Sequence, residues 1–471
     1  MTTYAEFIRS KRANIKSFGF QCGDTPQRLF GWQEHVVRWA VERGRAALFC
    51  DCGMGKTAMQ LAWAEAVVKH TGGTVMLHCP IGVRQQTIRE AQKFDISVPV
   101  VAVDDQSEVV AGTIVVANYE KLHRFDPTQF VGVVLDESSI LKSFTGSTKR
   151  RLIDSYSDTP YRLACTATPA PNDQMELGNH AEFLGVMRSS EMLSRWFIND
   201  TMKAGGYRLK GHAAESFWQW MASWAVCMRK PSDLDERFSD DGYELPPLIR
   251  TDHEIVMESG PCVESSTLFG VTSLNATTVH SAKRASCKAR SQQVADLIAS
   301  DDSEGPWIVW CDTNYEADDL VKAIRPICES LTEVRGSDKE SQKEMALAKF
   351  SSGGSRVIVT KPDIAGFGMN WQHCNNVCFV GLSYSYEKFY QAVRRSWRFG
   401  QARPVNVHVI TTDVEAVIDA TVDRKADSHA KMQDSMAAAM REFQCAVHAE
   451  DLRRDEYVPS QRMQIPDWVG T

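Results

Sequence analysis

A glycine-rich loop at residues 51–57, DCGMGKT, constrains the fold of this chain more than any other feature. An apolar run typical of a strand precedes the loop, and a helical pattern follows it. Gly53 and Gly55 allow backbone N–H groups to approach an anion without a Cβ in the way, and the N-terminus of the following helix points its positive end at the same place. This arrangement predicts a strand–loop–helix unit that binds phosphate.

Two side chains of this loop suit a nucleoside triphosphate. Lys56 would place a mobile positive charge beside the β- and γ-phosphates, and the Thr57 hydroxyl is a natural Mg²⁺ ligand. The usual motif begins with glycine at the position of Cys50, so this loop is a variant. The alternative interpretation is a glycine turn before a surface helix.

Short apolar runs alternate with helical patterns in both halves of the chain, which predicts mostly parallel sheets. The runs lie at residues 46–50, 74–79, 113–117, 131–135, 162–166, 307–311, 356–360, 376–380 and 405–410. The helical patterns include residues 57–69, 83–93, 315–324, 339–350 and 386–398. Residues 186–250 are rich in Trp and Met and end beside Pro246-Pro247, which predicts a helical insertion followed by a linker.

One expected strand, residues 131–137 (VGVVLDE), ends in two acids. In a parallel sheet it would deliver both carboxylates beside the phosphate-binding loop. Asp136 would then act on Mg²⁺, and Glu137 would orient the attacking water or take its proton. A solvated strand end is the alternative for this segment alone, but its place after Lys56 in one sheet favours the catalytic interpretation.

A second constellation lies at residues 391–401, QAVRRSWRFGQ. On a helix, Gln391, Arg395 and Arg398 would share one face. Arginines from a second lobe can neutralise the charge that develops on the γ-phosphate in the transition state. Periodicity does not choose between Arg394 and Arg395, because residues 391, 394 and 398 also share a face. A basic surface helix is the alternative.

Together these segments resemble the superfamily-two helicases, and most closely their Swi/Snf-type ATPase branch, from about residue 30 to residue 426. The resemblance implies an α/β fold of two RecA-like P-loop lobes with parallel sheets, which close on ATP and Mg²⁺ and step along nucleic acid. It selects Arg395 and Arg398 as the arginines that reach the γ-phosphate. The ending Gly400-Gln401 points most toward the Swi/Snf-type branch.

The resemblance also implies roles for residues elsewhere. The residues implied to bind ATP are Gln33 in FGWQE, which reads adenine, Gly368 in DIAGFGMN, and Gln391. Those implied to contact nucleic acid are Pro80, Tyr119 and Lys142. Those implied to couple hydrolysis to motion are Thr166 and Thr168 in TATP.

Four positions depart from the family pattern. Ser138-Ser139 stands where the family has Ala-His, so any link made by that histidine is absent or rebuilt. Arg394 and Trp397 replace Asp and His. These departures concern how hydrolysis is coupled to motion rather than hydrolysis itself. The short insertion resembles compact phage and bacterial members.

We expect five regions along the chain. They are an N-terminal extension (1–24), an ATP-binding lobe (25–185), a helical insertion and linker (186–250), a second lobe (251–430), and a C-terminal helix with a polar tail (431–471).

Composition limits the possible partners and compartment. The net charge is −7, so nucleic acid must be met by a local basic groove. The 13 cysteines are odd in number and scattered, which favours reduced thiols in a cytosolic protein. The resemblance to compact phage and bacterial members implies a bacterial or phage-infected host cytoplasm. The chain lacks any run of about 18 apolar residues and any signal-peptide pattern, so we expect no membrane span. We expect a monomer, and the sequence does not identify a protein partner.

Several other signals have two interpretations. The Trp-rich stretch could stack on bases, but its helical spacing favours core packing; its aromatic members are Trp196, Phe217, Trp218, Trp220 and Trp224. A basic group could meet phosphates or form a solvated cluster; its members are Lys283, Arg284, Lys288 and Arg290. Two Cys-containing groups, His373-Cys374 with Cys378 and the pair Cys50 and Cys52, are weak candidates for zinc and for a reactive thiol.

The predicted function is an ATP-dependent DNA translocase or helicase, with DNA preferred to RNA. The alternatives are an RNA helicase, an ATP-switched nucleic-acid clamp with slow turnover, and a nuclease or restriction subunit with a motor domain. Multiple turnover stimulated by a polynucleotide separates a motor from a switch, and the preferred polymer separates DNA from RNA.

Overall fold

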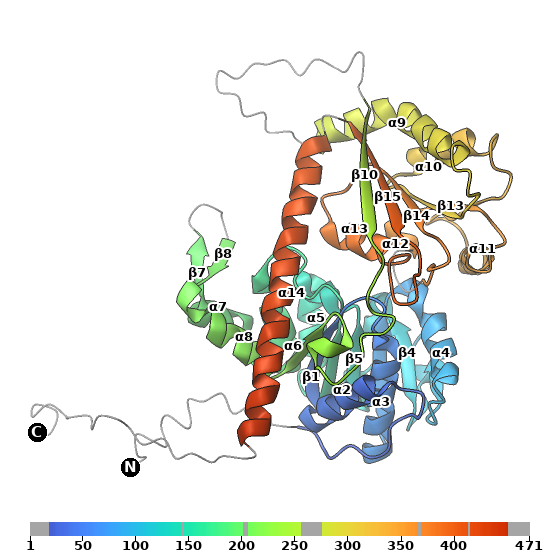
Figure 1. Cartoon of the computed structure of the whole chain (residues 1–471). Helices are drawn as coiled ribbons and strands as arrows, with labels where there is room; N and C mark the ends of the chain where they lie inside the picture. Colours follow the sequence, from blue (N-terminus) through green and yellow to red (C-terminus); the bar gives the residue numbers. More distant parts are fainter. Residues whose placement is uncertain are drawn as a thin grey trace, which may run out of the picture.

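Two parallel sheets, one in each half of the chain, organise the molecule (Figure 1). The structure, a computed structural model, describes residues 18–143, 146–200, 206–255, 276–365, 369–412 and 415–450. Among these residues, every strand pair in the two large sheets is parallel. The carboxyl ends of the strands in each sheet therefore lie along one edge, where ligands of such folds bind.

Lobe 1 contains a seven-stranded sheet in the order β3-β4-β2-β5-β6-β1-β9. Its strands are β1 (Arg45–Cys50), β2 (Thr74–Cys79), β3 (Val100–Ala102), β4 (Ile114–Asn118), β5 (Phe130–Asp136), β6 (Tyr161–Cys165) and β9 (Ala225–Met228). The helices that accompany it are α2 (Gly31–Arg43), α3 (Lys56–Thr71), α4 (Arg84–Lys93), α5 (Ser147–Ser155) and α6 (Leu177–Leu184). Strands β1 and β2 are almost wholly buried, as strands covered on both faces must be.

The insertion after α6 mixes helices and strands. Its elements are α7 (Ser189–Trp196), β7 (Phe197–Asp200), β8 (Gly206–Leu209) and α8 (Ala214–Ala222). Strands β7 and β8 form an antiparallel hairpin that projects from lobe 1 in Figure 1. The stretch was expected to be helical, so the hairpin is an addition, and β9 after it returns to pair with β1.

The Trp-rich group packs as core, as its spacing predicted. Trp196 and Trp220 stack with ring centroids 4.7 Å apart, and Phe217 is fully buried beside them. Trp218 and Trp224 are also buried. Base stacking by these rings is therefore excluded in this conformation.

Lobe 2 contains a six-stranded sheet in the order β10-β15-β14-β11-β13-β12. Its strands are β10 (Leu248–Ile255), β11 (Trp307–Trp310), β12 (Leu331–Glu333), β13 (Val357–Thr360), β14 (Asn376–Val380) and β15 (Val405–Thr412). The helices are α9 (Ala276–Ala299), α10 (Asn314–Ile324), α11 (Glu340–Ser351), α12 (Pro362–Ala365) and α13 (Tyr386–Val393). Alternate residues of β11 and β14 enter two separate core clusters, so helices cover both faces of the sheet.

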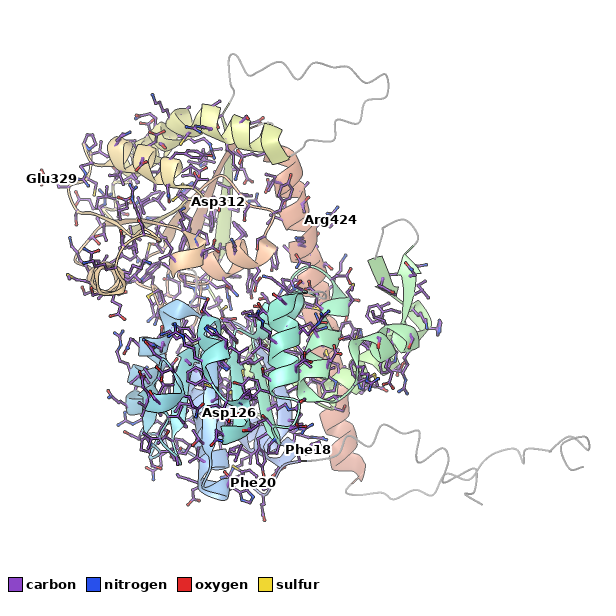
Figure 2. The ribbon with its side chains drawn as sticks, turned by 180° about the vertical axis from the view of Figure 1, so that it is seen from behind. Phe18, Phe20, Asp126, Asp312, Glu329 and Arg424 are labelled. Carbon is purple, nitrogen blue, oxygen red and sulfur yellow. The ribbon has the colours of Figure 1, made fainter. Side chains whose placement is uncertain are left out.

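A long final helix, α14 (Ala416–Glu450), runs beside both lobes in opposite views (Figures 1 and 2). Ile418 and Val422 at its start lie in the core of lobe 2. Met432, Met436 and Met440 lie in the core of lobe 1. The boundary expected at residue 430 falls inside this helix, which ties the two lobes together by burying apolar side chains in each.

The structure confirms every strand and helix predicted from the apolar runs to within a few residues, with one exception. The helix expected over residues 386–398 ends at Val393. None of the helices in the described ranges could span a membrane.

Candidate nucleotide site between the lobes

The glycine-rich loop joins β1 to α3 as predicted. Gly53 and Gly55 have φ angles of 89° and 73°, a left-handed conformation that costs glycine nothing. A Cβ on Gly55 would lie 2.3 Å from Nε2 of Gln33, which leaves no room for a side chain. The backbone conformation therefore favours glycine at this position, and a side chain here would also have to displace the amide of Gln33.

Gln33 lies on α2, only 3% exposed, directly against this loop. Its Nε2 donates to the carbonyl of Met54 at 3.2 Å, and its Oε1 accepts from the N–H of Phe30 at 3.0 Å. The residue expected to read adenine thus contacts the phosphate-binding loop.

Lys56 begins α3 and folds back onto the loop. Its Nζ donates to the carbonyls of Cys50 and Asp51 at 3.0 and 3.3 Å. In the described part of the chain it has no carboxylate within salt-bridge distance, so its charge is available to an anion. Thr57, the next residue, lies partly exposed in the first turn of α3.

Asp136 is the last residue of β5 and is buried. Its Oδ1 accepts from Nε2 of Gln60 at 2.8 Å, and its backbone carbonyl accepts from the hydroxyl of Tyr119 at 2.6 Å. Burial raises the pKa of Asp136 above its ordinary value, against the lowering effect of Gln60 and Lys56.

Glu137 follows with a left-handed backbone, φ 55°. Its Oε2 accepts from the hydroxyl of Thr166 at 3.3 Å. Burial raises the pKa of Glu137 to about 6, and the neighbouring Lys56 limits the rise. A carboxylate with this pKa is still a base near pH 7, as a residue that accepts a proton from water needs to be.

The predicted arginines lie in a turn, residues 394–400, that follows α13 and is called the arginine turn below. Backbone bonds from Arg395 to Ala392 and from Ser396 to Val393 span three residues instead of four, which tightens the chain and ends the regular helix. The shared helical face expected for Gln391, Arg395 and Arg398 is therefore wrong.

Arg395 and Arg398 nevertheless lie together, and the turn lies against the phosphate-binding loop. Both donate to the carbonyl of Met369, at 3.2 and 3.0 Å. A Cβ on Gly53 would lie 3.1 Å from the backbone nitrogen of Phe399 and 3.6 Å from Cβ of Arg398. Burial lowers the pKa of Arg398 to about 10, and Arg395 beside it acts in the same direction.

Arg394 has a different environment, which answers the question that periodicity left open. Its Nη2 lies 2.5 Å from Oδ2 of Asp51. Across the described residues, Arg395 and Arg398 have no acidic partner within 4.0 Å. Arg394 is therefore neutralised by the protein, while its two neighbours are not.

The coupling residues join the two lobes through an acid that the sequence reasoning missed. Glu387 of α13 accepts from Thr168 at 3.5 Å and from Lys142 of lobe 1. Thr166 accepts from the N–H of Thr168 at 3.1 Å and donates to Glu137. A chain of polar contacts thus runs from the acidic pair to lobe 2.

The acidic segment lacks the histidine of the family pattern, but a histidine from another helix lies beside this segment. His180 of α6 lies 3.1 Å from the hydroxyl of Ser138, and burial lowers the pKa of His180 to about 4. Ser138 is therefore held by a neutral imidazole inside lobe 1.

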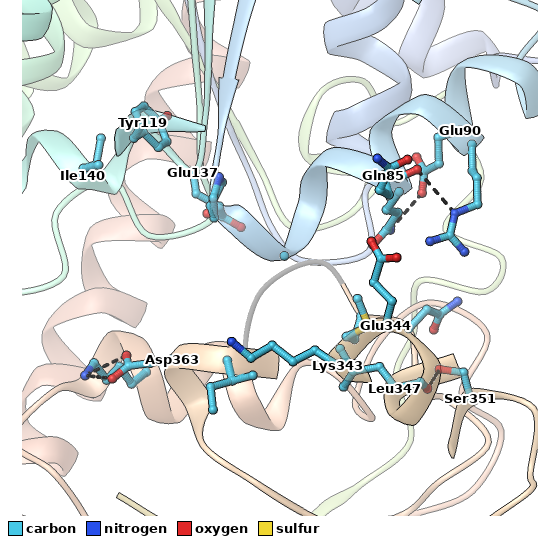
Figure 3. Close-up of a pocket in the computed structure, with 18 of the residues that line it drawn as sticks. Gln85, Glu90, Tyr119, Glu137, Ile140, Lys343, Glu344, Leu347, Ser351 and Asp363 are labelled. Carbon is cyan, nitrogen blue, oxygen red and sulfur yellow. Dashed lines mark hydrogen bonds and ion pairs between the residues drawn. The ribbon is translucent and has the colours of Figure 1, made fainter. Parts of the chain in front are cut away.

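A cleft of about 950 Å³ lies between the lobes. Figure 3 shows Tyr119 and Glu137 on its lobe 1 side, opposite Lys343 and Asp363 of lobe 2. The residues predicted to contact nucleic acid, namely Pro80, Tyr119 and Lys142, all line it. Tyr119 is 7% exposed, and Lys142 is engaged by Glu387, so their contact with nucleic acid stays a prediction.

For two of the residues predicted to bind ATP, the structure gives no contact that identifies their role. Gly368 lies outside the described residues. Gln391 is 1% exposed, and neither polar atom of its amide has a partner in the described structure. Such a group costs about 1–3 kcal/mol, which a bound ligand could recover.

The residues present fit a nucleoside triphosphate with a divalent metal. Among the residues that the structure describes, Lys56, Arg395 and Arg398 carry positive charge without acidic partners, and the glycine loop offers backbone N–H groups. Thr57 and Asp136 are the oxygen donors suited to a hard cation such as Mg²⁺.

Sequence reasoning missed four residues of this site: Asp51, Gln60, Glu387 and Tyr390. Gln60 had a local signal, since it is a polar residue in the apolar run AMQLAWA one turn after Thr57. Glu387 and Tyr390 had only their closeness to Gln391.

The basic group of lobe 2 divides into two exposed members, Arg284 and Lys288, and two buried members. Arg290 is fully buried and pairs with Glu316 at 3.3 Å, and Lys283 pairs with Asp312 at 3.4 Å. Both are neutralised inside the lobe, while Lys288 is exposed. Cys374 and Cys378 are buried in the lobe 2 cores, and the described residues contain no cluster of three metal-binding side chains.

Residues 289–400 match the family described as the helicase conserved C-terminal domain. Eukaryotic initiation factor 4A of Cryptosporidium parvum is 29% identical over 106 residues, which are 22% of this chain and 26% of that protein. The pre-mRNA-splicing ATP-dependent RNA helicase prp28 of Neosartorya fischeri is 25% identical over 130 residues, 28% of this chain and 16% of that protein. The chain therefore spans about a quarter or less of the length of these relatives.

A solved structure of the Sulfolobus solfataricus SWI2/SNF2 ATPase core in complex with dsDNA aligns with 92% of this chain and 98% of that chain. The identity is 18% and the TM-score is 0.42, which is too low to decide a branch. The helicase C-terminal match over residues 289–400, the helicase relatives and the two-lobed fold with its ordered motifs make this chain similar to the superfamily-two helicases.

Proposed function

We propose that this protein is a nucleic-acid-stimulated ATPase of the Swi/Snf-like type, which uses ATP and Mg²⁺ to move along or remodel DNA. One observation carries the proposal. Two arginines of lobe 2, the buried Arg395 and the partly buried Arg398, lie against the glycine loop of lobe 1 without an acidic partner in the described chain. A triphosphate held by that loop would provide the missing negative charge.

The side chains have distinct roles in this proposal. Lys56 turns from the loop carbonyls toward the β- and γ-phosphates, and Gln33 contacts adenine. Bound Mg²⁺ supplies charge stabilisation between the phosphates, with Thr57 and Asp136 as its protein side. Glu137 orients the attacking water and takes its proton, while Arg395 and Arg398 stabilise the charge on the γ-phosphate.

Motion follows from contacts that change with the state of the nucleotide. Glu137 contacts Thr166, Thr168 contacts Glu387, and Glu387 belongs to the same helix that leads to the arginine turn. Loss of the γ-phosphate removes the anion that holds the two lobes together. The lobes then open and close about α14, and each cycle advances nucleic acid along the cleft.

DNA is the proposed substrate because the ending Gly400-Gln401 resembles the Swi/Snf-type branch. An RNA helicase is the second candidate, favoured by the curated relatives, whose names include RNA helicases. The cleft wall carries both lysines, such as Lys93 and Lys343, and acids, such as Glu90 and Glu344, so its charge does not choose between the two polymers.

The test is steady-state ATP hydrolysis with no polymer, duplex DNA, single-stranded DNA and RNA, with Glu137→Gln as the blank. Stimulation by duplex DNA that the blank lacks supports the translocase, and single-strand preference supports a helicase. Stronger stimulation by RNA would make RNA, and not DNA, the substrate. Hydrolysis that no polymer stimulates contradicts the proposed motor and favours an ATP-operated switch.

A further inference from the structure

Asp51 occupies a fixed place in the glycine loop of lobe 1. Its backbone N–H donates to the carbonyl of Met228 in β9 at 2.9 Å, and its Oδ1 accepts from the N–H of Cys52 at 2.6 Å. Asp51 as a whole residue is 6% exposed. The mechanism above gives it no role.

Both oxygens of this carboxylate are bound by lobe 2. Arg394 donates from Nη2 to Oδ2 at 2.5 Å and to the carbonyl of Cys52 at 3.0 Å. The hydroxyl of Tyr390 donates to Oδ1. Two side chains from α13 and the arginine turn therefore converge on one acid of the phosphate-binding loop.

The partners of Asp51 are themselves held in place. The guanidinium of Arg394 lies 5.7 Å from the ring centroid of Tyr390 and 5.0 Å from that of Trp397. Trp397 donates from Nε1 to the carbonyl of Pro246 at 2.7 Å, which anchors the turn to the linker. The ring of Tyr390 also contacts that of His429 on α14, with centroids 5.5 Å apart.

The opposite charges of Arg394 and Asp51 meet in a buried place. The side chains of Arg394 and Asp51 are 5% and 9% exposed. Burial would lower the pKa of Arg394, but Asp51 and Tyr390 outweigh it and raise that pKa. Removing one member of such a pair leaves a buried charge without a partner, whereas opening the lobes returns both to water. The contact therefore forms only when the lobes meet in this register.

The consequence for the site comes from the shortness of the arginine turn. Arg395 follows Arg394 directly, and Arg398 lies one turn further along the chain. The carbonyl of Arg398 accepts a hydrogen bond from the N–H of Gln401. Because three-residue backbone bonds leave little slack, fixing Arg394 on the loop fixes the direction of both neighbours. A displacement of about 1 Å at a reacting group can cost about 100-fold in rate.

We propose that Asp51, Arg394 and Tyr390 form an interlock between the lobes that positions Arg395 and Arg398 over the γ-phosphate. Asp51 and Arg394 are positioning residues, since they act through the neighbouring arginines and not on the substrate. The inference rests on the proposed ATPase function. It also explains why an arginine can stand at position 394, where the family has an acid: the acid that neutralises it stands in the loop.

The experiment is a double-mutant cycle of Asp51→Asn and Arg394→Gln, with kcat and nucleotide affinity measured separately. Each single variant should lower kcat about 10- to 100-fold while the Kd for ATP changes less than about threefold, because the glycine loop and Lys56 remain. The double variant should be no slower than the worse single variant, since the pair acts as a unit. Tyr390→Phe should have a smaller effect in the same direction.

Two controls separate positioning from folding. Arg403→Gln, an exposed arginine whose guanidinium donates to the carbonyl of His373, should leave kcat unchanged. Hydrogen exchange should show faster exchange in residues 394–401 of both interlock variants and unchanged protection in β11 and β14. General loss of protection would mark a folding defect, and Arg394→Lys would then replace Arg394→Gln, with partial recovery of kcat expected.

The outcomes that overturn the inference differ from those that overturn the function. Additive losses in the double variant, equal losses of affinity and rate, or normal exchange in the arginine turn would each exclude the interlock while leaving the ATPase intact. Absence of hydrolysis in the unmodified protein would instead defeat the proposed function, and the interlock as a positioning device with it.

Discussion

The carboxyl ends of the strands in the two lobes carry charged side chains, but the two sets are neutralised in different ways. In lobe 2, Lys283 and Arg290 lie beside Asp312, Glu316 and Glu415, which supply carboxylates within 3.9 Å. In lobe 1, the corresponding edge holds Lys56, Asp136 and Glu137, whose bonds in the described structure go to carbonyls, an amide and hydroxyls. One edge satisfies its own charges, and the other leaves them for a ligand.

This difference shows how one fold can serve two purposes. Gly381, at the end of β14, packs directly against this ion network: a Cβ there would lie 2.6 Å from Nη1 of Arg290 and 2.9 Å from Oε1 of Glu415. At the end of β1, Gly53 faces the arginine turn of the other lobe instead. The charged groups at the strand ends of lobe 2 thus pair within the lobe, whereas those at the strand ends of lobe 1 are the ones proposed to act on a nucleotide together with lobe 2.

The largest effect that tests this comparison should come from Glu137→Gln. The change removes the proposed base from the open edge, so kcat should fall about 10²- to 10⁴-fold while ATP binding persists. Steady-state hydrolysis and equilibrium binding of ATP measure the two quantities. Glu329→Gln, the same change at an exposed site of lobe 2, is the control. Normal turnover in Glu137→Gln would show that this acid is not the base.

Arg398→Ala should have the next largest effect. Loss of one charge-stabilising arginine should reduce kcat about 10³-fold or more, and the Kd for ATP much less, because the charge it meets develops in the transition state. Arg403→Ala is the matched exposed control. An equal loss of rate and affinity would assign Arg398 to ground-state binding.

Sequence patterns predicted the interior strands of both sheets but missed four strands. Strands buried on both faces read as continuous apolar runs, so β1, β2, β5 and β14 were recognisable. Strand β10, LIRTDHEI, lies at the edge of its sheet and is largely exposed, so it has no such run. Strands β3 and β12 have three residues each, too few for a pattern to be distinguished from a loop. Strand β9, AVCM, directly follows the Trp-rich helical stretch, so its apolar run was read as part of that stretch.

The site divides in the same way, into local motifs and long-range contacts. The glycine loop and the acidic pair were predictable because each is a short segment with its own chemistry. Gln60 meets Asp136 across 76 residues, Lys142 meets Glu387 across 245, and Asp51 meets Arg394 across 343. No local pattern encodes such pairs, and the early end of α13 depends on where its arginines are held.

The third prediction concerns the ion pairs at the strand ends of lobe 2. Arg290→Met leaves Glu316 and Glu415 buried with less positive charge, so lobe 2 should lose about 3–5 kcal/mol of stability. Calorimetry and hydrogen exchange of α9 and α10 would measure this loss. Lys288→Met, at an exposed site on the same helix, should change stability by less than about 0.5 kcal/mol. Equal stability of the two variants would show that the buried ion network does not support lobe 2.

The smallest expected effect is a pH dependence of kcat/KM that comes from Glu137, at the strand ends of lobe 1. Burial raises the pKa of Glu137 to about 6, so the acid becomes protonated as the pH falls below that value, and a protonated acid cannot accept a proton from water. The quantity kcat/KM reports the free enzyme, and it should fall about tenfold for each pH unit below about 6. Thermal unfolding over the same range should show that both lobes remain folded.

The residual rate of Glu137→Gln provides the control for this profile, because an amide does not titrate. Its pH profile should lack the break near 6 that the unmodified protein shows. A break that persists in Glu137→Gln would assign the titration to another group, and a midpoint near 4 would mean that the carboxylate is as well hydrated as a surface glutamate. Either result would contradict the proposed dry environment of this acid, because burial is the main cause of the raised pKa of Glu137, with Asp136 and Glu387 acting in the same direction.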